Sequence, residues 1–202
     1  MGVPLMPPMQ PTLIQQQRPP AYISFSAEIN PSTTEALLAA FANFVNQAFR
    51  EICLLLSTPG GSVVHGINVY NILRGLPISL TTHNVGNVDS IGTVIFLAGN
   101  RRYACPQANF MLHGVAFASI GPAQFFERNL QERIESLRAD QQRIAAIYQD
   151  RTGINAQEAE QLFLREQTIN ASEAVNRGLI HEVRDVQVPA GSPIFQLVFN
   201  RK

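Results

Sequence analysis

The chain has 202 residues, 46% of them hydrophobic and 15% charged, which is enough apolar material for one domain with a buried core. Fifteen basic residues balance fifteen acidic ones, so charge gives no argument for a nucleic-acid partner. The two cysteines, Cys53 and Cys105, are too few for a disulfide framework. No apolar stretch has the length of a membrane span and no secretory signal is visible, so we expect a cytoplasmic protein without a membrane partner.

Composition divides the chain into three parts. Residues 1–20 hold six prolines and three successive glutamines, and we predict a flexible tail there. Residues 21–185 are predicted to form the folded domain. Residues 186–202 are predicted to form a C-terminal extension, in which the apolar run Phe195–Phe199 is either a strand or a docking tail.

Strand and helix patterns alternate through the domain, which favours an α/β fold. Strands are predicted at residues 22–27, 52–56, 78–82, 108–112 and 179–183. Helices are predicted at residues 32–49, 64–73, 90–98 and 122–148, with short ones beginning at Asn155 and Asn170. Ser32 and Glu35 form the expected capping box of the first helix, and a glycine-bearing loop is expected at residues 84–89.

Ser90 is the strongest candidate for a catalytic residue. It lies in the segment GNVDSIG, between a polar loop and an apolar helix. Backbone N–H groups at the start of a helix are free to stabilise a developing oxyanion. The alternative is that Ser90, or Asp89, is only the N-cap of that helix. The segment is not the G-x-S-x-G elbow of hydrolases, because Val88 occupies the first glycine position.

Two other features are weak when taken alone. Gly60 and Gly61 follow a buried strand, where they either let backbone amides approach a ligand or form a simple tight turn. His113 closes a strand, but a single histidine is more often a structural residue. No pair of histidines has the spacing of a metal motif, so we expect neither a metal nor a cofactor.

Taken together, these motifs resemble the Clp protease proteolytic subunit family. The resemblance runs from about Ile52 to Val183 and rests on the order and spacing of short motifs: STPGG at 57–61, GNVDSIG at 86–92, MLH at 111–113 and ASEA at 171–174 before GLI at 178–180. It implies a Clp/crotonase-like α/β fold, a spiral of β-β-α units with a helical handle.

The resemblance also implies a Ser-His-Asp triad and an oxyanion hole made of two backbone amides. The serine and histidine positions match Ser90 and His113, and the two amides match Gly61 and Ile91. In this arrangement the histidine takes the serine proton while the amides hold the oxyanion.

The third member of the triad departs from the family pattern. Counting from the flanking motifs places the aspartate position on Glu166, whose side chain is one methylene longer. The alternative for Glu166 is a solvent-facing charge beside Arg165. Asp89 is next to the serine, but we expect it to point elsewhere and to be a poor substitute.

The family resemblance implies partners as well. The substrates would be peptides or unfolded proteins, and the oligomer would be a ring of seven subunits, with two rings joined through the helical handle. The apolar stripe from Phe125 to Tyr148 fits such a handle. In the family an N-terminal segment and aromatic pockets serve a hexameric AAA+ unfoldase. The Pro/Gln tail has little similarity to that segment, so unfoldase docking is left open.

The function that the sequence predicts is a serine-type endopeptidase acting through a Ser90 acyl-enzyme inside a ring. A Ser-Lys peptidase is disfavoured, because the only lysine is Lys202. A crotonase-like acyl-CoA enzyme is disfavoured by the Ser90 and His113 pair. An inactive structural subunit, assembled with an active paralogue, stays open because of Glu166.

Overall fold

The computed structural model describes residues 18–116 and 126–199. Most of the tail expected at residues 1–20 lies outside these ranges, as does Pro122. The described strands are β1 (Ala21–Ser26), β2 (Glu51–Thr58), β3 (Ser79–Asp89), β4 (Arg101–Ala104), β5 (Asn109–Leu112), β6 (Gln167–Asn170), β7 (Glu182–Val183) and β8 (Ile194–Leu197). The described helices are α1 (Pro31–Asn46), α2 (Val63–Gly75), α3 (Gly92–Phe96), α4 (Glu127–Arg151), α5 (Ala156–Arg165) and α6 (Ala171–Asn176).

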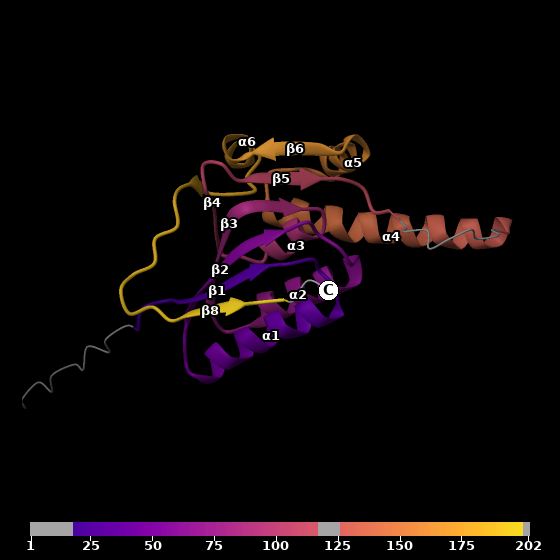
Figure 1. The fold of residues 1–202 in the computed structure, drawn as a ribbon. Helices are drawn as coiled ribbons and strands as arrows, with labels where there is room; N and C mark the ends of the chain where they lie inside the picture. The colour runs from indigo at the N-terminus through magenta and orange to yellow at the C-terminus, as the bar shows by residue number, and fades with distance from the viewer. Residues whose placement is uncertain (1–17, 117–125, 200–202) are drawn as a thin grey trace, which may run out of the picture.

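The eight strands form one sheet, in which β6, β5, β3, β2, β1 and β8 follow one another from top to bottom of Figure 1. β4 pairs with β3 and with β7, and among the strands of the described ranges only the β5–β6 pair is antiparallel. Parallel strands joined through helices are the pattern of an α/β protein, so the predicted fold class is confirmed. β8 pairs with β1, which identifies part of the C-terminal apolar run as a strand.

The core lies between the sheet and a row of helices in which α1 packs on α2, α2 on α3 and α3 on α4. Large apolar side chains fill it, and Phe96 of α3 meets Phe110 of β5 edge to face with 5.1 Å between ring centroids. The continuous apolar run of β2 is buried by this layering. None of the helices in the described ranges is both long and apolar enough to cross a membrane.

Two local predictions are wrong in detail. The first helix is capped by Asn30 rather than Ser32: the Thr33 amide donates to the Asn30 side chain (3.0 Å), and Pro31 occupies the first turn.

The loop expected at residues 84–89 belongs to β3. This strand continues because it changes partner, pairing with β4 up to Asn84 and with β5 from Asn87 onward.

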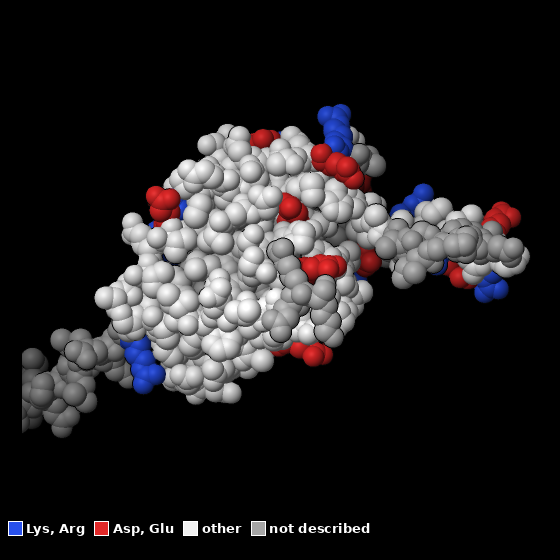
Figure 2. Space-filling model, in the orientation of Figure 1, with Lys and Arg blue, Asp and Glu red and all other residues white. Residues whose placement is uncertain are grey.

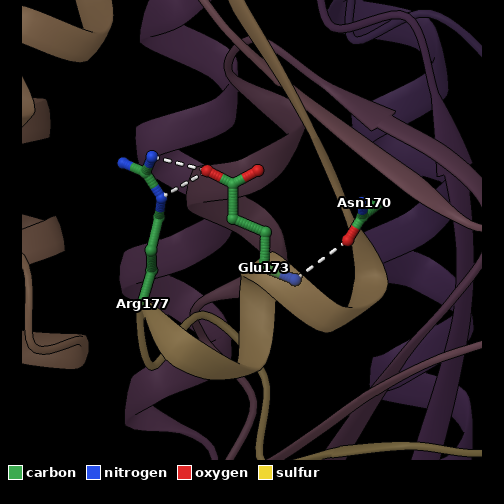
Figure 3. Close-up of polar contacts among 3 residues, drawn as sticks. All are labelled: Asn170, Glu173 and Arg177. Carbon is green, nitrogen blue, oxygen red and sulfur yellow. Dashed lines mark hydrogen bonds and ion pairs between the residues drawn. The ribbon is translucent and has the colours of Figure 1, made fainter.

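The start of α6 agrees with the prediction and is shown in Figure 3. The Asn170 side chain accepts a hydrogen bond from the Glu173 amide (2.9 Å), as an N-cap does. The Glu173 carboxylate pairs with Arg177 one turn later (2.6 Å). Gly178 follows with φ +71°, the left-handed conformation that ends helices. This cap fixes the end of β6, which lies beside β5.

Helix α4 extends from the body of the molecule on the right of Figure 1. Its last turns are buried through Ile144 and Tyr148, whereas Leu130 and Ile134 are 45% and 47% exposed. Charged side chains are scattered over the described part of the face in Figure 2 and form no single basic patch there. The outer part of α4 therefore carries apolar side chains, Leu130 and Ile134, that are about half exposed.

Candidate active site

Ser90 lies in the sharp turn between β3 and α3. Its φ is +54°, a conformation that costs a non-glycine residue about 1–2 kcal/mol. Two sets of contacts hold it there: the Ser90 amide donates to the Met111 carbonyl (2.8 Å), and the Ser90 carbonyl accepts from the Thr93 amide (3.1 Å). The N-cap position of α3 is Ile91, and no side chain caps that helix. A strained serine in such a turn is typical of an exposed nucleophile.

The Gly60–Gly61 turn lies directly against this serine. A Cβ on Gly60 would come within 2.6 Å of the Ser90 Cβ, so only glycine permits the approach. Gly61 forms a bridge with Ile29, whose amide donates to the Gly60 carbonyl (2.7 Å) and whose carbonyl accepts from Ser62 (2.8 Å). Because Ile29 bonds to the residues on either side of Gly61, the amide of Gly61 itself faces away from Ile29.

The amide of Ile91 belongs to the first turn of α3, where N–H groups have no partner within the helix. Its side chain is 2% exposed. The side chain packs so closely on α2 that a Cβ on Gly66 would lie 2.3 Å from it. This packing fixes the backbone immediately after Ser90.

His113 follows the last residue of β5. Its Nδ1 lies 2.7 Å from the Gly114 carbonyl, which can only accept, so Nδ1 carries the proton and donates. In the neutral ring Nε2 then keeps its lone pair and is free to accept a proton. This is the tautomer that a general base acting on a hydroxyl requires.

Ser90 and His113 line one cavity of about 100 Å³. The wall is mostly apolar, and α4 contributes to it through Ile144 and Tyr148. The remaining lining residues are Gly61, Val63, Ile91, Thr93, Leu112, Gly114, Val115 and Ala116. The structure thus brings together four of the five residues selected from the sequence, namely Ser90, His113, Gly61 and Ile91.

Glu166 is the fifth, and it does not line the cavity. It is an exposed residue with φ +44° that ends α5. The antiparallel pairing of Leu112 with Gln167 brings Glu166 to the same end of the ladder as His113. The Nδ1 hydrogen bond of His113, however, goes to the Gly114 carbonyl.

Asp89 is the second carboxyl group near the histidine. Burial raises the pKa of Asp89, while the backbone amide of Met111 and the charge of His113 act in the opposite direction. The sequence alone disfavours Asp89 as the third member of a triad. In the structure, however, Asp89 is half-buried, and a positive charge on His113 favours its ionised form.

The other histidines have structural contacts. His65 Nδ1 bonds to the Ser62 hydroxyl (2.8 Å), His83 donates to the Arg184 carbonyl (3.0 Å), and His181 accepts from the Arg102 amide (3.0 Å).

Burial raises the pKa of the Cys53 thiol to about 12, which keeps it protonated and unreactive. In the described ranges, no three His, Cys, Asp or Glu side chains are grouped so as to hold a metal ion.

Sequence reasoning missed two residues at the site, Thr93 and Tyr148. The sequence places Tyr148 on the apolar stripe of a long helix, and the residue is fully buried. Its hydroxyl donates to the Thr93 hydroxyl, 55 residues away in the sequence. Helical periodicity reveals which side chains face the core, but not which polar group their hydroxyls reach.

The sequence also matches a known protein family. The family model described as Clp protease matches residues 13–187. The match contains all five selected residues, and the mostly parallel sheet with its helices fits the α/β fold of that family.

Proposed function

The chain belongs to the Clp protease family, and from this premise we propose that it is a serine-type endopeptidase that cleaves unfolded proteins or peptides through an acyl-enzyme on Ser90. Family membership itself indicates a peptidase. One observation carries the serine assignment: a strained Ser90 and a His113 whose Nδ1 bonds to the Gly114 carbonyl line the same cavity, beside the Gly60–Gly61 turn.

In the proposed reaction, Nε2 of His113 accepts the proton of the Ser90 hydroxyl while Oγ attacks the peptide carbonyl carbon. The amides of Gly61 and Ile91 donate to the resulting oxyanion. The imidazolium then returns the proton to the leaving amine, and the C–N bond breaks to give the acyl-enzyme. A water molecule, deprotonated by His113, hydrolyses the ester and restores Ser90.

The walls of the cavity suggest which substrates fit. Val63, Leu112 and Ile144 offer apolar surface next to the nucleophile. A charged substrate side chain would lose its hydration there without gaining a partner. We therefore expect cleavage after apolar residues of moderate size.

Labelling with a fluorophosphonate, which phosphonylates activated serines, tests the proposal. We expect intact mass to show one adduct per folded chain, peptide mapping to place it on Ser90, and no adduct after unfolding in guanidinium. An adduct confined to another serine would contradict the assignment. Absence of any adduct on the folded protein would favour an inactive structural subunit.

Such a structural subunit, assembled with an active paralogue, is the second candidate. Two points favour it: counting from the flanking motifs places Glu166 where the family pattern has an aspartate, and His113 Nδ1 bonds to a backbone carbonyl rather than to a carboxylate. Both candidates share the same assembly, a ring of subunits, which the family generally forms. Rings of seven subunits, stacked in pairs, are part of the proposal, whereas docking of an AAA+ unfoldase stays open because the Pro/Gln tail has little similarity to the family's N-terminal segment.

The exposed part of α4 is the surface that we propose for this assembly. Ile134→Glu places a charge on its apolar stripe. Because Ile134 is 47% exposed, we expect the fold to be retained and the assembly to be lost. We expect light scattering to report a lower molecular mass than for the wild type. Ser136→Glu adds the same charge on the other side of the helix and should leave the mass unchanged. Equal masses for both variants would point to a different interface.

A further inference from the structure

A chain of buried hydroxyl groups connects α4 to the nucleophile. The Tyr148 hydroxyl donates to Thr93 Oγ1 (2.5 Å), and Thr93 Oγ1 donates to the Ser90 carbonyl (2.6 Å). The direction is fixed because a carbonyl oxygen can only accept. Tyr148 is 0% exposed and Thr93 is 1% exposed, so water does not compete for these bonds.

The peptide bond between Ser90 and Ile91 is planar, so the contact at the Ser90 carbonyl also affects the Ile91 N–H. The Ser90 carbonyl and the Ile91 N–H belong to one trans peptide group, in which they point in opposite directions. Hydrogen bonds that hold the carbonyl therefore also set the direction of the Ile91 N–H. The Ile91 N–H is one of the two donors proposed for the oxyanion.

The strain at Ser90 makes this restraint necessary. With φ at +54°, the turn relaxes toward an unstrained conformation unless contacts hold both sides of the residue. Met111 holds the Ser90 amide, whereas the Ser90 carbonyl receives the Thr93 amide and hydroxyl. Tyr148 in turn fixes the Thr93 hydroxyl, and burial raises the pKa of the Tyr148 phenol, which keeps it a donor.

We propose that Tyr148 is a positioning residue, which acts through Thr93 and the Ser90 carbonyl to aim the Ile91 amide at the oxyanion. The inference rests on the proposed function and adds to it a residue from α4. A misdirected amide weakens binding of the transition state more than binding of the substrate. Removal of either hydroxyl should therefore lower kcat and leave KM unchanged.

The test uses the full-length protein and a short amide substrate with an apolar residue before the scissile bond. Tyr148→Phe and Thr93→Val remove one hydroxyl each at nearly constant volume. We expect kcat to fall about tenfold for Tyr148→Phe and about a hundredfold for Thr93→Val, since complete loss of an oxyanion donor costs about 10²–10³. KM should stay within about twofold, as for an interaction made only in the transition state.

Two further variants separate positioning from packing. Thr93→Ser keeps the hydroxyl and should restore kcat relative to Thr93→Val. Tyr70→Phe removes a hydroxyl from another buried tyrosine, which does not line the cavity, and should behave as wild type. If Tyr148→Phe does not fold, the Thr93→Val and Thr93→Ser pair still tests the positioning role.

The outcomes distinguish this inference from the function on which it rests. Equal kcat in wild type, Tyr148→Phe and Thr93→Val would overturn the positioning role alone. The positioning role also fails if Thr93→Ser is as slow as Thr93→Val, or if the loss lies in KM. A wild-type protein that neither hydrolyses the substrate nor reacts with a fluorophosphonate would overturn the proposed function, and the inference with it.

Discussion

Replacing Ser90 with alanine is expected to abolish fluorophosphonate labelling and to lower peptide hydrolysis by about 10⁴-fold or more, because loss of a nucleophile removes the acyl-enzyme route altogether. The contacts that hold the turn are made by the backbone of Ser90, to Met111 and Thr93, and an alanine retains them. The variant should therefore fold, and the loss of rate should reflect chemistry. Intact mass and a peptide-cleavage assay measure the two effects.

Ser62→Ala is the matched control for this experiment. Ser62 follows the Gly60–Gly61 turn and is half-buried, and its hydroxyl bonds to His65 rather than lining the cavity. We expect labelling and hydrolysis close to those of the wild type. A Ser90→Ala protein that still acquires one adduct would show that another residue is the nucleophile.

The sequence predicts the fold well wherever neighbouring residues determine the structure. The apolar run of β2 and the asparagine caps at Asn155 and Asn170 lie at the predicted positions. The capping pattern of α1 favours Ser32, although Asn30 and Thr33 have the same spacing. Proline favours the first helical position, so Pro31 makes Asn30 the cap.

Features that depend on distant partners are not predictable in this way. β6 is a strand because it pairs with β5, more than fifty residues earlier, and the polar end of β3 is a strand for the same reason. Motif spacing identifies Ser90, His113 and the two amides, and the structure brings them to one cavity. Their catalytic roles stay predictions, as does the role of Glu166.

The second large effect is expected for the replacement of His113 with alanine. His113→Ala removes the group that accepts the Ser90 proton, and we expect acylation to slow by about 10³-fold or more, since each member of a catalytic triad is needed by the others. His65→Ala, at a half-buried histidine that bonds to Ser62, serves as the matched control and should retain the rate. The rate of fluorophosphonate labelling, followed by mass, reports acylation directly.

The same labelling assay tests whether Glu166 orients the His113 ring. Glu166 reaches the histidine only if the Nδ1 proton leaves the Gly114 carbonyl, to which it bonds at 2.7 Å. Glu166→Gln should then lower the labelling rate by about tenfold or more, without the full loss seen for His113→Ala, because an orienting group contributes less than the base it orients. If Glu166→Gln labels at the wild-type rate, Glu166 does not orient the histidine, which leaves the Gly114 carbonyl and the nearby Asp89 as the groups that could do so.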